Sequence, residues 1–121
     1  MSEYETHTTI AERYIETWNE GDDAVRRTLL DELYLPEATY TDPLAAVTGV
    51  DEIGEMIAGV RQQFAGMGFT LGAVDGHHDQ LRLTWNLGMP EAEPLIVGFD
   101  VVVLDGDCIA SVYGFLDRVP S

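Results

Sequence analysis

The sequence predicts an α+β protein, in which three helices come first and an antiparallel β-sheet follows. Apolar residues recur at helical spacing up to Phe64, and from Phe69 onward they alternate with polar residues, as in strands. The glycine-containing stretch at residues 66–68 marks the change. A chain of 121 residues has the size of one domain, and a curved sheet closing over helices forms a cone around a pocket. We therefore expect a single domain over residues 1–121, with a flexible tail at about 1–8.

The first helix is expected to begin at Thr9, because Thr9 and Glu12 have the spacing of a capping box. Its apolar stripe includes Tyr14 and Trp18. Tyr14 should therefore face the core, where its hydroxyl needs a hydrogen-bonding partner. The helix is expected to end at Gly21.

Two more helices are expected, with a short strand between them. Asp22 can cap the second helix, which Pro36 closes, and the third begins at about Asp51. The strand occupies residues 39–41 and ends at Asp42, which the following proline keeps out of helical geometry. The apolar stripes of these helices consist of Val25, Leu29, Leu30 and Leu33, and of Ile53, Ile57, Val60 and Phe64.

Four strands are expected after the helices, at residues 69–74, 81–87, 95–104 and 108–116. The third of them is apolar on both faces, which is typical of a buried strand, except for the carboxylate of Asp100. A lone ionised carboxylate in such surroundings costs several kcal/mol. Asp100 is therefore expected to be paired, hydrogen-bonded or protonated.

The register of the last hairpin decides what lies beside Asp100. A two-residue turn at Asp105-Gly106 places Asp100 opposite Ser111. A slip by one residue places Val112 and Gly114 beside it instead. We favour the first register, because it groups the polar atoms. The pocket face then carries Gly98, Ser111, Tyr113 and Phe115.

Composition excludes several classes of function. The formal net charge is −16, which argues against nucleic acid and anionic membranes as partners. The chain has no lysine, so Schiff-base chemistry is excluded, and its single cysteine, Cys108, rules out an internal disulfide. No apolar run approaches the ~20 residues that span a bilayer, and the polar N-terminus does not have the pattern of a signal peptide. We therefore expect a cytoplasmic protein with no membrane partner.

The histidines do not predict a metal site. On a strand the side chains of His77 and His78 point to opposite faces, so they cannot bind one ion together, and His7 falls in the expected tail. His77 shares the alternation of Trp85, which places it at the rim of the pocket unless a bulge shifts it.

Short motifs occur along almost the whole chain, at residues 12–14, 18–22, 38–43, 98–100 and 109–117. Together they resemble the nuclear transport factor 2-like superfamily, in its SnoaL-like branch. The resemblance implies a conical fold with a central pocket. The superfamily includes ketosteroid isomerases, polyketide cyclases, epoxide hydrolases, dehydratases and non-catalytic binding domains, so it predicts the fold better than the function.

Three positions resemble the site of the ketosteroid isomerases. Asp42 matches the general base that moves a proton from a carbon next to a carbonyl. Tyr14 and Asp100 match the two donors to the resulting oxyanion, the second of them a protonated carboxyl. The residues expected to line the pocket are Trp18, Phe64, His77, Trp85, Ser111, Tyr113 and Phe115.

The sequence therefore predicts a cofactor-independent isomerase or cyclase that acts on a small hydrophobic molecule. The alternative is a non-catalytic ligand-binding or dimerisation domain of the same fold. In that case Tyr14 is a core residue, Asp42 initiates a turn and Asp100 accepts hydrogen bonds that serve the fold. The other face of the Asp100 strand, from Leu95 to Val103, is apolar, which predicts a homodimer packed through it.

Overall fold

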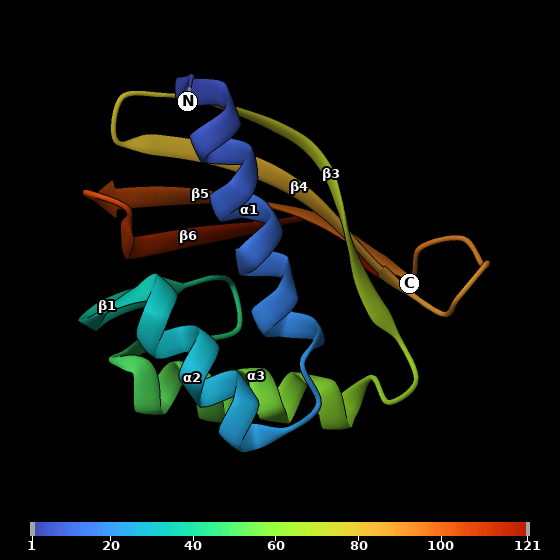
Figure 1. Cartoon of the computed structure of the whole chain (residues 1–121). Helices are drawn as coiled ribbons and strands as arrows, with labels where there is room; N and C mark the ends of the chain where they lie inside the picture. Colours follow the sequence, from blue (N-terminus) through green and yellow to red (C-terminus); the bar gives the residue numbers. More distant parts are fainter. Residues whose placement is uncertain (1, 121) are drawn as a thin grey trace.

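The computed structural model describes residues 2–120 and has the predicted α+β fold (Figure 1). Over this range, three helices lie against a curved sheet of six strands. In Figure 1, α1 crosses one face of the sheet, and α2 and α3 lie below it, beside β1. The elements are α1 (Glu3–Asn19), α2 (Asp23–Leu33), β1 (Tyr34–Thr41), β2 (Ala46–Thr48), α3 (Val50–Gln63), β3 (Gly68–His77), β4 (Gln80–Gly88), β5 (Ile96–Asp105) and β6 (Cys108–Arg118).

The sheet is mixed rather than wholly antiparallel. Its strand order is β2-β1-β6-β5-β4-β3, and β1 runs parallel to β6. β1 begins at Tyr34 rather than at residue 39, and its register with β6 shifts between Tyr34 and Thr39. Pro36, which has no N–H for a ladder, lies in that irregular stretch. β1 thus places the segment that ends at Asp42 directly beside the last strand.

The first helix begins earlier than predicted. The Ser2 hydroxyl caps α1 by accepting a hydrogen bond from the Glu5 amide at 3.1 Å, so residues 3–8 are helical and do not form a tail. Met1 lies outside the described residues. His7 is buried, and its Nε2 donates to the carbonyl oxygen of His78 at 3.1 Å. The first turns of α1 therefore pack onto the β3–β4 hairpin.

The core lies between the helices and the inner face of the sheet. In α2, capped by Asp22 as predicted, the expected apolar position Val25 is 47% exposed. Arg26 is buried in its place, where it donates to the carbonyl oxygen of Glu20 and pairs with Asp23. The fully buried apolar side chains include Ile53, Ile57, Leu81, Leu83, Val102, Ile109 and Val112.

The last hairpin does not have the favoured register. Its two-residue turn lies between Asp105 and Cys108, and a bulge follows between Val103 and Leu104. The partner of Asp100 is Gly114, as in the alternative register, and not Ser111. Because the bulge adds a single residue, it reverses the faces of β6. Side chains predicted to point into the pocket therefore point out of it.

Candidate functional site

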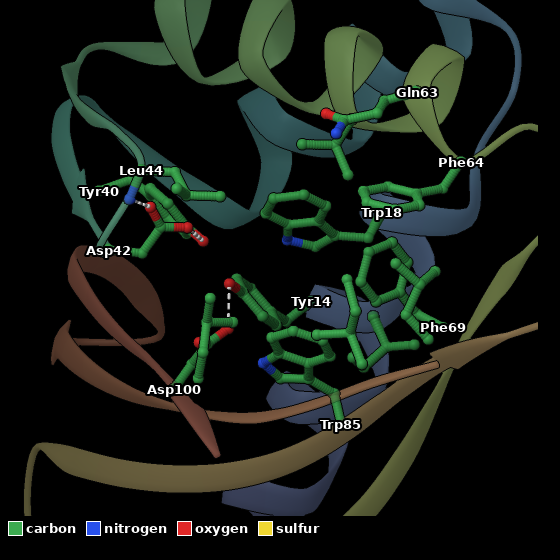
Figure 2. Close-up of a pocket in the computed structure, with 15 residues that line it drawn as sticks. Tyr14, Trp18, Tyr40, Asp42, Leu44, Gln63, Phe64, Phe69, Trp85 and Asp100 are labelled. Carbon is green, nitrogen blue, oxygen red and sulfur yellow. Dashed lines mark hydrogen bonds between the residues drawn. The ribbon is translucent and has the colours of Figure 1, made fainter. Parts of the chain in front are cut away.

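A pocket opens between α1, α3 and the inner face of the sheet, with a cavity of about 110 Å³ (Figure 2). Three of the residues that line it have a carboxyl or amide group in the side chain, namely Asp42, Gln63 and Asp100. The remaining walls are largely apolar. The aromatic lining residues are Tyr14, Trp18, Tyr40, Phe64, Phe69 and Trp85.

Asp100 lies at the inner end of this pocket, with only 3% of its surface exposed. The Tyr14 hydroxyl donates to its Oδ2 at 2.6 Å, and Oδ1 has no hydrogen-bonding partner in the described part of the chain. Figure 2 shows the indole nitrogen of Trp85 directed towards the same carboxyl group. Burial raises the pKa of Asp100 to about 6, against the opposing effects of Tyr14 and Trp85, and the nearby Asp42 adds to the increase. Asp100 is therefore a buried carboxyl group that changes charge near neutral pH.

Tyr14 comes from the apolar stripe of α1 and is 1% exposed. Burial raises its pKa well above the ordinary value for tyrosine, and the negative charge of Asp100 raises it further. The Tyr14 hydroxyl therefore keeps its proton and acts as a hydrogen-bond donor. Tyr40, also buried, has its pKa raised by burial and by the two aspartates, so it too remains a donor.

Asp42 faces the pocket from the loop between β1 and β2. Its Oδ1 accepts hydrogen bonds from the amides of Leu44 at 2.8 Å and Ala45 at 2.9 Å, and its Oδ2 accepts one from the Tyr40 hydroxyl at 2.8 Å. The turn expected of an Asp-Pro pair is thus present. The same turn holds the carboxylate in a fixed orientation at the pocket wall.

Two glycines make room for this arrangement. A Cβ atom on Gly114 would lie 2.8 Å from Asp100 Oδ1 and 3.1 Å from Asp42 Cβ. Asp42 and Asp100 can therefore lie close together because residue 114 has no side chain. A Cβ atom on Gly98 would lie 2.5 Å from Trp85 Cζ2. The Trp85 ring therefore occupies the space that a side chain at residue 98 would need.

Six of the predicted site residues line the pocket and four do not. Tyr14, Asp42 and Asp100 face one cavity, and Trp18, Phe64 and Trp85 form part of its wall. The four that do not line the pocket are His77, Ser111, Tyr113 and Phe115.

The reversed faces of β6 explain three of the four misplaced residues. Tyr113 is 45% exposed and Phe115 is 51% exposed, both on the outer face of the sheet. Ser111 accepts a hydrogen bond from the Thr39 hydroxyl across the β1–β6 ladder at 3.2 Å. His77 pairs with Gln80 across the β3–β4 turn and is exposed, because β3 also carries a bulge between Leu71 and Val74.

The sequence-based prediction missed several lining residues, of which Tyr40 and Gln63 carry polar groups. Tyr40 could have been predicted, because side chains two residues apart on a strand share a face. Tyr40 therefore points in the same direction as Asp42. Gln63 gives no such signal, since it lies outside the apolar stripe of α3. Leu44, Phe69, Leu87, Ile96 and Leu116 also line the pocket.

Within residues 2–120, no three side chains of His, Cys, Asp or Glu gather in a way that could hold a metal ion. In the same range, no helix combines the length and the apolar character required to cross a membrane.

The sequence from residue 11 to residue 112 matches the family model of the SnoaL-like domain. The chain belongs to the SnoaL-like family. This confirms the predicted nuclear transport factor 2-like superfamily and its fold. A search of the curated proteins finds no match to the chain.

Three solved structures illustrate the likeness. A candidate isomerase of the SnoaL-like family from Agrobacterium tumefaciens is 39% identical, and the match covers 94% of this chain and 99% of that one with a TM-score of 0.89. A candidate ketosteroid isomerase from Kribbella flavida matches over 100% and 84% of the two chains, at 16% identity and a TM-score of 0.73. A candidate SnoaL-like polyketide cyclase from Jannaschia matches over 97% and 90%, at 16% identity and a TM-score of 0.72. At 16% identity the last two similarities demonstrate a shared fold only.

Proposed function

We propose that the protein is a cofactor-independent isomerase or cyclase that moves a proton on the carbon next to a carbonyl of a small hydrophobic compound. The observation that carries this proposal is the meeting of Asp42 with the Tyr14–Asp100 pair in one apolar pocket. A base on one side and proton donors on the other are the groups that enolisation requires.

In the proposed reaction the Asp42 carboxylate removes a proton from the α-carbon of the substrate. The C–H electron pair becomes the C=C bond of an enolate, and the carbonyl π pair moves onto oxygen. Tyr14 and protonated Asp100 stabilise this oxyanion by hydrogen bonds. In an isomerisation, the proton returns from Asp42 to another carbon of the conjugated enolate, and the electron pair on oxygen re-forms the carbonyl. In a cyclisation, the enolate carbon attacks a second carbonyl carbon of the substrate, the first carbonyl re-forms, and the π pair of the second moves onto its oxygen, which takes the proton from Asp42.

The direction of the Tyr14–Asp100 hydrogen bond matters for this role. With ionised Asp100, the Tyr14 proton points to Oδ2 at 2.6 Å. When Asp100 is protonated, it no longer requires the Tyr14 proton, so the Tyr14 hydroxyl and the Asp100 carboxyl can both donate to the substrate oxygen. An apolar substrate removes further water from Asp100 and thereby favours the protonated form.

The size of the cavity limits the enclosed part of the substrate. An apolar cavity of about 150 Å³ holds one benzene ring, so a cavity of about 110 Å³ suits a small ring or a short chain. Tyr113 and Phe115, which would have filled the pocket, lie on the other face of the sheet. The remaining space favours a role in binding small molecules over a purely structural role.

The proposal can be tested without the natural substrate. Cyclohexanone and cyclopentanone in D₂O should exchange their α-protons faster with the protein than in buffer alone, as followed by proton NMR. Exchange should be lost in D42N and retained in D105N, a change of the same kind at the exposed end of β5. If neither ketone exchanges above the buffer rate although both displace a pocket-binding dye, the proposed chemistry is wrong.

We also propose a cytoplasmic homodimer that forms through the outer face of the sheet. Phe99 and Phe115 stack there with ring centroids 5.0 Å apart, and Phe115 and Tyr113 are about half exposed. Apolar surface of this kind is typical of a protein interface. Light scattering at micromolar concentration should give the mass of two chains, and F115E should give that of one. A monomeric wild type contradicts the interface.

A further inference from the structure

The pocket has two chemically different ends. We call Tyr14, Tyr40, Asp42 and Asp100 the acid end, and Trp18, Phe64, Phe69 and Trp85 the aromatic end. Figure 2 shows the two carboxyl groups on one side of the pocket and the rings of Trp18, Phe64 and Phe69 on the other. A ligand that fills the pocket therefore meets carboxyl groups at one extremity and apolar rings at the other.

The acid end has no counter-charge among the residues that line the pocket. None of them is an arginine, lysine or histidine. Arg61, the arginine of α3, donates to the carbonyl oxygen of Trp18 at 3.0 Å and does not line the cavity. Asp42 receives hydrogen bonds only from neutral groups, and Asp100 Oδ1 has no partner in the described range of residues. The negative charge at the acid end is therefore not neutralised by any residue that lines the pocket.

We propose that the pocket binds a small organic cation, an ammonium group on an apolar body, with its head at the acid end and its body between the aromatic rings. Ammonium N–H groups donate well to carboxylates, and the ring faces at the other end attract cations as well as apolar groups. The positive head also reduces the repulsion between Asp42 and Asp100. The inference concerns the same pocket as the proposed reaction but does not depend on turnover.

The test compares three ring compounds of similar shape and different charge. Isothermal titration calorimetry at pH 8 should rank cyclohexylammonium first, cyclohexanol second and cyclohexanecarboxylate last, with about tenfold or more between the cation and the alcohol. Equal or tighter binding of the alcohol overturns the proposal, as does tighter binding of the carboxylate. No heat from cyclohexylammonium at about 10 mM also overturns it, since a dissociation constant above that is too weak for a specific site.

Variants assign the preference to the acid end. D100N and D42N remove one charge each with little change in shape, and each should reduce the affinity for cyclohexylammonium by about tenfold while leaving that for cyclohexanol nearly unchanged. D105N removes the same charge from the exposed end of β5 and should behave as the wild type. If D105N reduces the affinity for cyclohexylammonium as much as D100N does, attraction by the overall charge of −16 explains the binding, and the pocket proposal fails.

The pH dependence gives an independent readout. The titratable groups that face Asp100 are Asp42, Tyr14, Tyr34 and Tyr40. Burial raises the pKa values of the three tyrosines above the ordinary value for tyrosine, so they stay neutral. Affinity for cyclohexylammonium should therefore rise between pH 5 and pH 8, as Asp100 loses its proton. Affinity for cyclohexanol should not rise, and a flat profile for the cation contradicts the proposal. A failed ketone exchange with this ranking intact would overturn the proposed reaction and leave the cation site standing.

Discussion

The two acids of the pocket are the same residue type in opposite environments. Asp42 sits on a loop and accepts hydrogen bonds from two amides and one phenol. Asp100 sits in the middle of a buried strand, with one hydrogen bond from Tyr14 and one oxygen without a partner. Donors stabilise a carboxylate, whereas burial disfavours it. The fold thus separates a fixed acceptor from a carboxyl group poised to hold a proton, and this difference is what a base and an acid in one site require.

The largest effect is expected from D42N in the ketone exchange assay. An amide cannot accept the α-proton, so exchange should fall by about 10²- to 10⁴-fold. The backbone amides of Leu44 and Ala45 can still donate to the side-chain oxygen of asparagine, so the turn should persist. Thermal unfolding within a few degrees of the wild type would confirm this. A folded D42N variant with full exchange activity would show that Asp42 is not the base, and Asp100 would then be the carboxyl group left for that role.

The second prediction concerns the contribution of Asp100 to the pH dependence of the unfolding free energy. Its pKa is raised from 3.8 in the unfolded chain to about 6 in the fold, so folding favours the protonated form. The stabilisation is fully present below pH 4 and is lost as the pH rises through about 6. The shift corresponds to about 3 kcal/mol. Relative to wild type, D100N should therefore gain about 3 kcal/mol of unfolding free energy between pH 4 and pH 7.

Urea denaturation at several pH values measures this difference, because the other carboxyl groups cancel between the two proteins. D105N should follow the wild-type curve, since Asp105 is exposed at the end of β5 and lies far from the pocket lining. A constant offset between D100N and wild type would show that Asp100 titrates at its ordinary pKa.

A smaller effect is expected from closing the space between the two acids. In G114A the added methyl group meets Asp100 Oδ1 and Asp42 Cβ at 2.8 and 3.1 Å, so the variant should lose about 1–3 kcal/mol. G59A is the matched control, because a Cβ atom there has nothing within 4 Å and Gly59 lies inside α3. It should gain up to about 1 kcal/mol. Equal stability of the two variants would mean that the acids do not depend on Gly114.

The smallest effect is expected at Ser111. Its hydroxyl bonds to Thr39 on the face away from the pocket, so S111A should cost less than about 1 kcal/mol and leave the affinity for cyclohexanol unchanged. A change in pocket affinity beyond twofold would place Ser111 back beside Asp100.

The helical stripes and the coarse architecture could be read from the sequence, because they depend on local periodicity. Tyr14 and Trp18 point inward as the pattern predicts. The start of α1 was misplaced for a physical reason. Ser2 and Glu5 have the same capping-box spacing as Thr9 and Glu12, and the earlier cap starts the helix.

The register of the last hairpin could not be read in this way. A bulge depends on how two strands meet, and no local pattern in β5 or β6 marks one between Val103 and Leu104. The preference for grouping polar atoms then favoured Ser111 over Gly114. The glycine was the better partner, because it leaves space where the carboxyl groups of Asp42 and Asp100 meet.

The measurement that bears most directly on the two acids is a ¹³C NMR titration of their carboxyl groups, assigned with D42N and D100N. The Asp100 signal should titrate near pH 6, and removal of its hydrogen bond in Y14F should move that pKa upward, because the bond favours the ionised form. An Asp100 pKa near or below 4 in the wild type would contradict a carboxyl group poised to hold a proton, and with it the proposed donor role.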